Sequence, residues 1–151
     1  MNTVYGDLIK LAEDGEFDVI IHGCNCFCKM GAGVAKAIRS SFPEAVVADL
    51  ETAKGDRAKL GSISVVDVHR AGRTITVVNG YTQFHWAGPG RLVDYDAVKS
   101  VMCKVKAGFS GKRIGYPRIG AGLARGNWEV IEKIIDKELK GEDHTLVEYS
   151  P

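Results

Sequence analysis

The sequence predicts one α/β domain in which a mixed, mostly parallel sheet lies between two layers of helices. Segments that resemble buried strands alternate with segments of helical periodicity along the 151 residues. This alternation is typical of a three-layer α/β/α sandwich, in which helices connect parallel strands. Two expected strands are separated by a short turn, which adds one antiparallel hairpin. No linker, repeat or low-complexity tract divides the chain, so we expect a single domain over residues 1–151.

In the first half of the chain, apolar runs and helix-start signals indicate five elements. Phe17–His22 is a continuous apolar run of the kind found in strands that are buried on both faces. Pro43 stands where a proline suits the first turn of a helix. In chain order we expect a strand at 3–5 ended by Gly6, a short amphipathic turn at 8–12, a strand at 17–22, and helices at 33–41 and 44–54.

The second half is expected to begin with the hairpin and to end with strands and helices in alternation. Asp94 and Asn127 are predicted N-caps, because their side-chain oxygens can accept hydrogen bonds from first-turn amides. Segment 80–93 has three glycines, one proline and four aromatic or histidine residues, which favours a functional loop. In chain order we expect strands at 62–69 and 74–79 joined by a turn at 71–73, a helix at 95–107, a strand at 113–117, a helix at 128–139 and a strand at 146–149.

Composition and charge narrow the class of protein. A hydrophobic content of 45% and a charged content of 26% are typical of a globular protein, and the net charge of +1 argues against a broad nucleic-acid surface. No apolar run is long enough to span a membrane, and no signal peptide is expected. Three of the four cysteines crowd residues 24–28, which favours reduced thiols and a cytoplasmic location. Because no CxxC or HxxxH pattern occurs, no metal site is expected.

Two glycine loops carry the main functional signal. Residues 31–34 (GAGV) and 120–123 (GAGL) each follow an expected strand and precede an expected helix. Backbone N–H groups and the helix dipole make such a position a cradle for anions, and two cradles can hold a pyrophosphate between them. The alternative is that the glycines only form tight turns. A dinucleotide fingerprint is not favoured, because the third glycine is missing, and no Walker sequence occurs.

Three motifs together resemble those of macrodomains, the ADP-ribose-binding α/β/α modules. They are GDLI at residues 6–9, IIHGCNCFCKMGAGVAKAI at 20–38 and YPRIGAGLARGNW at 116–128. The resemblance extends from Gly6 to Tyr149 and implies a macrodomain-like sandwich. Within the family, the HxCNC pattern at residues 22–26 is similar to the small branch that includes ADP-ribose-1″-phosphate phosphatases and phage-type proteins. The terminal ADP-ribose protein glycohydrolases share the same compact outline.

The resemblance also implies which residues bind ADP-ribose. Asp7 would accept a hydrogen bond from the adenine amino group, the Leu8 amide would meet the ring, and Tyr149 would pack against adenine. Asn25 would bind the distal ribose, since an amide side chain offers both a donor and an acceptor. The phosphates would be held by the backbone amides of Gly31, Ala32, Gly33 and Val34 in one loop and of Ile119, Gly120, Ala121, Gly122 and Leu123 in the other.

Three residues are candidates for catalysis at the distal ribose. His22 would act as acid or base, since an ordinary histidine titrates near pH 6.5; the alternative is a buried histidine bonded to a backbone carbonyl. His85 lies in the irregular segment 80–93, either as part of a lid that also moves a proton or as a surface histidine. Asn25 would orient the reacting group. Asp7 and Asn25 have the further alternative of serving only as a helix cap and a turn residue.

Two departures from the glycohydrolase pattern limit the mechanism. That branch uses a lysine after the middle strand, but residues 79–83 contain none. It also has an aspartate after the second glycine loop, where this chain has Ala124. A lysine nucleophile is therefore not expected, and water would attack instead.

Together with the resemblance, the sequence predicts a monomeric ADP-ribose-binding hydrolase without a cofactor. The most specific form of this prediction is an enzyme that removes the phosphate of ADP-ribose-1″-phosphate. The alternatives are a reader of free or protein-linked ADP-ribose without turnover, or a hydrolase that releases ester-linked ADP-ribose from macromolecules. ADP-ribosylated macromolecules are accordingly predicted partners, and a membrane is not. A role as a partner in RNA processing rests on family association alone.

Overall fold

The computed structural model describes all 151 residues and contains one six-stranded sheet. Its order is β1–β6–β5–β2–β4–β3, and only the β3–β4 pair is antiparallel, as the predicted hairpin requires. The mixed, mostly parallel sheet is therefore confirmed. The strands are β1 (Asn2–Gly6), β2 (Val19–Asn25), β3 (Ile63–Arg70), β4 (Arg73–Gln83), β5 (Arg113–Tyr116) and β6 (Asp143–Tyr149).

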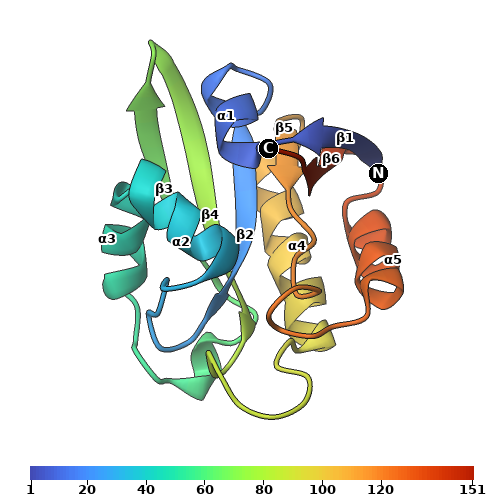
Figure 1. The fold of residues 1–151 in the computed structure, drawn as a ribbon. Helices are drawn as coiled ribbons and strands as arrows, with labels where there is room; N and C mark the ends of the chain where they lie inside the picture. The colour runs from blue at the N-terminus through green and yellow to red at the C-terminus, as the bar shows by residue number, and fades with distance from the viewer.

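Five α-helices cover the two faces of the sheet (Figure 1). One apolar core forms between the sheet and the helices α4 and α5, and a second forms between the sheet and α1, α2 and α3. These layers confirm the three-layer sandwich. The helices are α1 (Leu8–Glu13), α2 (Gly33–Ser41), α3 (Glu44–Leu50), α4 (Tyr95–Phe109) and α5 (Trp128–Glu138), with one short 3-10 turn, η1 (Arg57–Lys59).

Both predicted N-caps are confirmed. An Asp94 carboxylate oxygen accepts a hydrogen bond from the Ala97 amide at 2.9 Å, and the Asn127 side-chain oxygen accepts one from Glu129 at 3.0 Å. The helix expected at 44–54 ends earlier, at Leu50, and β6 begins at Asp143 instead of residue 146. None of the helices combines the length and the apolarity that crossing a membrane requires.

The strand expected at 74–79 continues to Gln83, so the irregular segment starts after that residue and not at Gly80. The reason is packing. Gly80 pairs with Gly23 of β2 and Ile63 of β3. A Cβ atom on Gly80 would lie 2.7 Å from a methyl group of Val101. This glycine therefore allows α4 to approach the sheet, and it does not form a turn.

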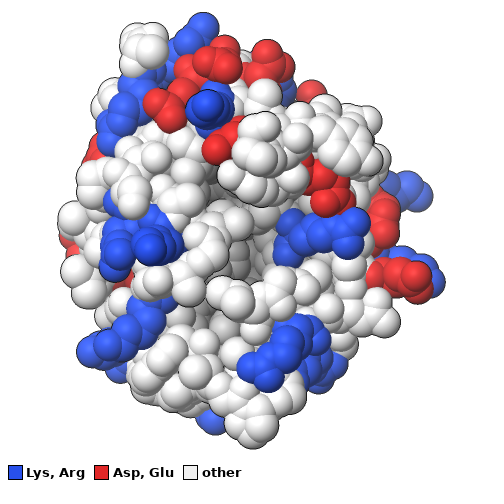
Figure 2. Space-filling model, in the orientation of Figure 1, with Lys and Arg blue, Asp and Glu red and all other residues white.

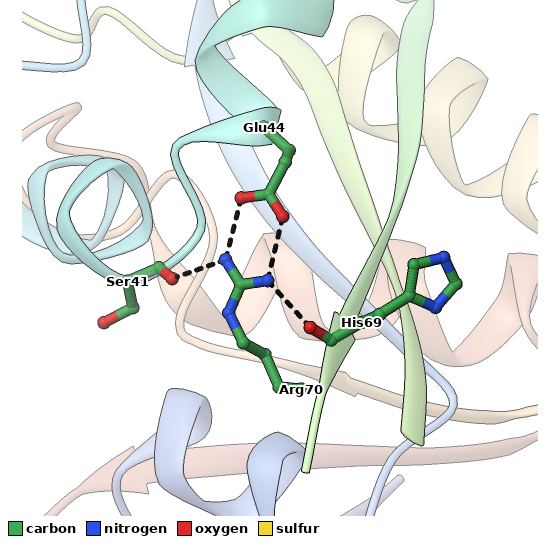
Figure 3. A network of polar contacts seen from close by, with 4 residues as sticks. All are labelled: Ser41, Glu44, His69 and Arg70. Carbon is green, nitrogen blue, oxygen red and sulfur yellow. Dashed lines mark hydrogen bonds and ion pairs between the residues drawn. The ribbon is translucent and has the colours of Figure 1, made fainter. Parts of the chain in front are cut away.

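An ion pair ties the α2–α3 corner to the sheet (Figure 3). The Arg70 guanidinium at the end of β3 donates to both Glu44 carboxylate oxygens, at 2.8 and 2.9 Å, and to the carbonyls of Ser41 and His69. These bonds hold the pKa of Glu44 below its usual value. Because the groups are partly exposed, the pair adds orientation more than stability.

Candidate ligand-binding cleft

A cavity of about 830 Å³ opens at the carboxyl edge of the parallel strands. It lies between the loop that leads from β2 into α2 and the loop that leads from β5 toward α5. Figure 2 shows the hollow on this face, with Lys and Arg side chains around it. This edge is where ligands bind in open α/β sheets, and the volume is in the usual range for small-molecule sites.

The first wall of the cavity contains Gly31–Val34, and its amides are unpaired. The N–H groups of these four residues have no acceptor within the chain. Ala32 caps α2 with no side-chain hydrogen bond, so the end of the helix dipole is also free. Gly33 has φ +60°, a left-handed conformation that suits glycine. The loop thus presents several donors and a partial positive charge to the cavity.

The opposite wall contains Ile119–Leu123, but only some of its amides are available. The Ile119 amide donates to Pro117 and the Ala121 amide donates to Arg118. The N–H groups of Gly120, Gly122 and Leu123 have no acceptor within the chain. All five residues line the cavity, so the prediction that this loop forms part of the site agrees with the geometry, while two of its five donors are already used.

Asn25 lines the cavity between the two loops, but its side-chain amide forms its hydrogen bonds within its own loop. Its side-chain oxygen accepts hydrogen bonds from the amides of Phe27, at 3.0 Å, and Lys29, at 3.3 Å. Its nitrogen donates to the Lys29 carbonyl at 2.8 Å. The side chain is 7% exposed. Asn25 therefore shapes residues 26–29, the turn role that the sequence left open for it.

Tyr149 stands at the end of β6 and lines the cavity with 74% of its surface exposed. Its register partner is Gly6 at the end of β1, so Asp7 and Leu8 follow directly beyond this edge. Neither residue lines the cavity. One Asp7 carboxylate oxygen caps α1 by accepting hydrogen bonds from Ile9 and Lys10, and Leu8 is buried in the core. Adenine binding by Asp7 and Leu8 stays a prediction.

His22 lies outside the cavity, which corrects its predicted placement. It is 1% exposed, and its Nε2 donates to the Asn79 side-chain oxygen at 2.6 Å, since that oxygen has no proton to give. The two residues are register partners on β2 and β4. Burial lowers the pKa of His22, so the ring is neutral at pH 7. The alternative of a buried, hydrogen-bonded histidine is the better description, with an amide as its partner.

Two buried histidines make stability depend on pH. Burial lowers the pKa of both His22 and His144 in the folded chain. Protons therefore favour the unfolded chain below about pH 6.5, where free histidine titrates. The free energy of unfolding should fall between pH 7.5 and pH 5.5, by up to about 1.4 kcal/mol per pH unit for each histidine. Urea unfolding at both pH values measures this, and equal stabilities would contradict it.

His85 is also absent from the cavity lining. Its ring stacks on Trp86, with centroids 3.9 Å apart, and its Nδ1 lies 2.7 Å from the Ala87 carbonyl oxygen. The neighbouring Trp86 lines the cavity in its place. The surface alternative for His85 agrees with this position, and the aromatic residue of this segment that lines the cavity is Trp86.

Sequence reasoning missed several charged, polar or aromatic side chains of the cavity: Lys29, Arg39, Gln83, Trp86, Arg118 and Glu148. Lys29 and Arg39 flank the first glycine loop, and basic residues beside an anion cradle were the signal that could have identified them. Gln83 ends β4 at the same edge as Asn25. It would have been found if the strand had been predicted at its full length.

Unpaired amides on two loops at the carboxyl edge of a parallel sheet are a feature that sites for phosphate compounds share. The family model of the Macro domain matches residues 21–135. The chain belongs to the macrodomain family.

Two relatives and one solved structure are similar to this chain over most or all of its length. An uncharacterised 17.5 kDa protein of Enterobacteria phage T4 is 37% identical, over 98% of this chain and 96% of the phage protein. A DNA ADP-ribosyl glycohydrolase of Mycobacterium tuberculosis is 25% identical over 85% of this chain, which spans 35% of that protein. The structure of Thermosipho africanus DarTG in complex with ADP-ribose has a TM-score of 0.75 and 16% identity, covering all of this chain and 42% of that one.

Proposed function

We propose that this macrodomain binds ADP-ribose with the diphosphate between its two glycine loops. One observation carries the proposal: a single cavity is lined by four residues of the first loop and three of the second whose amides are unpaired. Unpaired backbone N–H groups call for acceptors, and a diphosphate supplies them together with negative charge. Lys29 and Arg39 line the same cavity and add positive charge. The ADP-ribose complex of the similarly folded DarTG is consistent with this ligand.

The ligand would extend along the cavity between two distinct ends. The adenine end lies at Tyr149, where β6 and β1 finish. The distal ribose then lies toward Asn25 and Gln83, at the ends of β2 and β4. In this orientation Asp7 is close to the adenine end. One of its carboxylate oxygens caps α1, and the other would accept a hydrogen bond from the adenine amino group.

Hydrolysis at the distal ribose is the second candidate function, with ADP-ribose-1″-phosphate or ester-linked ADP-ribose as the substrate. The relative named as a DNA ADP-ribosyl glycohydrolase supports hydrolase chemistry in general. Against a histidine mechanism, His22 and His85 both lie outside the cavity. Water would then attack with Asn25 holding the loop in place. Recognition of ADP-ribosyl groups on macromolecules without turnover is the alternative to hydrolysis.

Calorimetry with ADP-ribose, combined with phosphate release from ADP-ribose-1″-phosphate on the same preparation, tests both candidates. Binding without phosphate release supports the reader. Binding with release identifies the phosphatase and rejects the reader. If ADP-ribose does not bind, the proposal that the two loops hold its diphosphate is wrong.

An Asn25→Ala variant should lose affinity for ADP-ribose by about tenfold. The variant removes the three side-chain hydrogen bonds that fix the conformation of residues 26–29. AMP reaches the adenine end and its adjacent loops, so its affinity should change less than the affinity for ADP-ribose. Calorimetry with both ligands measures the difference. Equal losses for AMP and ADP-ribose would show that Asn25 does not serve the distal end.

A further inference from the structure

The cavity wall contains a cysteine that the proposed function does not use. Cys28 is half-buried, lines the cavity and lies between Asn25 and the first glycine loop. Its sulfur lies 3.5 Å from the Lys59 ammonium nitrogen, which comes from the short turn η1. The sulfur also lies 3.3 Å from the Asp49 carbonyl oxygen, to which a thiol can donate.

Lys59 is a buried cation, and the buried carboxylate of Asp49 belongs to the same cluster, where it accepts a hydrogen bond from the Tyr81 hydroxyl at 2.7 Å. Lys59 is 7% exposed, and its ammonium forms no ion pair. The ammonium donates to the Cys26 carbonyl at 3.2 Å and lies 4.5 Å from the centroid of the Tyr81 ring. The Cys28 sulfur is the nucleophilic atom in contact with this ammonium, and a neighbouring lysine is a feature of reactive cysteines.

The sulfurs of the other three cysteines have no ammonium among their hydrogen-bond partners. Burial raises the pKa of Cys24 and Cys26, which therefore stay protonated. Cys103 is exposed, but its sulfur lies 3.4 Å from a carboxylate oxygen of Glu138. A carboxylate beside a sulfur opposes the thiolate, while an ammonium favours it. Cys28 and Cys103 thus form a natural comparison within one chain.

We propose that Cys28, paired with the Lys59 ammonium, is the reactive thiol of this protein and a modification site for electrophiles such as hydroperoxides. The thiolate attacks one peroxide oxygen, so that an S–O bond forms as the O–O bond breaks. The sulfur is oxidised to a sulfenic acid, and the peroxide is reduced as its other oxygen leaves, as hydroxide from hydrogen peroxide or as alkoxide from an organic hydroperoxide, and takes up a proton. Cys28 itself is one of the residues that line the cavity. Modification therefore competes with ligand binding, a consequence that rests on the proposed function.

Alkylation by iodoacetamide, followed residue by residue with peptide mass spectrometry, tests the reactivity. Cys28 should react at least about tenfold faster than Cys103, although Cys103 is more exposed, because the thiolate is the nucleophile. A faster reaction at Cys103 would overturn the proposal. This comparison uses the wild-type protein and needs no variant to fold.

A Lys59→Met variant tests the cause. Its Cys28 rate should fall toward that of Cys103, while the Cys103 rate stays unchanged and serves as the internal control. Thermal unfolding shows whether the variant is folded. An unchanged Cys28 rate in a folded variant would remove Lys59 from the explanation. If the variant does not fold, the wild-type comparison decides.

Hydrogen peroxide in the presence and absence of saturating ADP-ribose tests the competition. Dimedone labelling of the sulfenic acid should be strong at Cys28 without ligand and at least about fivefold weaker with it, since a bound ligand restricts access. Fast labelling that ADP-ribose does not reduce would overturn the competition. Absence of ADP-ribose binding in calorimetry would reject the proposed function, whereas the alkylation rates would still judge the thiol.

Discussion

A Gly33→Glu variant is expected to lose binding of ADP-ribose by at least about 100-fold, because it places a negative charge among the amides proposed to hold the diphosphate. Gly33 lies at the first position of α2 and lines the cavity. The nearest atom to a Cβ on Gly33 is a Leu123 methyl carbon at 3.4 Å, so the core is not disturbed. Calorimetry with ADP-ribose measures the loss, and circular dichroism checks the fold.

Gly72→Glu is the matched control for this variant. Gly72 has φ +75°, close to the +60° of Gly33, and a Cβ atom there has no neighbour within 4 Å. It lies in the hairpin turn between β3 and β4 and does not line the cavity. The control therefore carries the same charge and a similar backbone strain away from the site. If both variants bind like the wild type, the first loop does not hold the diphosphate.

The fold could be predicted from the sequence because its signals are local. Apolar runs and capping residues such as Asp94 and Asn127 act within a few residues of themselves, and the structure confirms both caps. The prediction was wrong where packing between distant segments decides. Gly80 was interpreted as the start of a loop, but it lies within β4. Val101 of α4 packs where a side chain on residue 80 would lie, so glycine is required there for packing.

The candidate site shows the same division between local and long-range information. The glycine loops are continuous segments, and all nine of their predicted residues line the cavity. The sequence did not show that His22 is buried, because the direction of a strand side chain and its partner depend on the neighbouring strand. His22 donates to Asn79, which is 57 residues away in sequence. The Cys28–Lys59 contact joins residues that are 31 positions apart, and no sequence motif predicts such a contact.

Asn79 holds together a buried polar network beside the cavity, and its loss should be costly. Its oxygen accepts from His22, while its nitrogen donates to the Ala45 carbonyl and to the Ser64 hydroxyl, both at 3.0 Å. The residue is fully buried. An Asn79→Ala variant leaves the buried His22 ring and the Ala45 carbonyl without partners that water can replace, so the free energy of unfolding should fall by about 3 kcal/mol.

Thr76→Ala on the same strand is the control, since its hydroxyl donates to Asp67 at an exposed position of the hairpin, at 2.7 Å. This variant should lose only about 0.5 kcal/mol. Urea unfolding of both variants at pH 7.5 measures the difference. His22 loses its partner in Asn79→Ala but stays buried, so ADP-ribose affinity should change far less than stability if the histidine takes no part in binding. A large loss of affinity with unchanged stability would instead return His22 and Asn79 to the functional site.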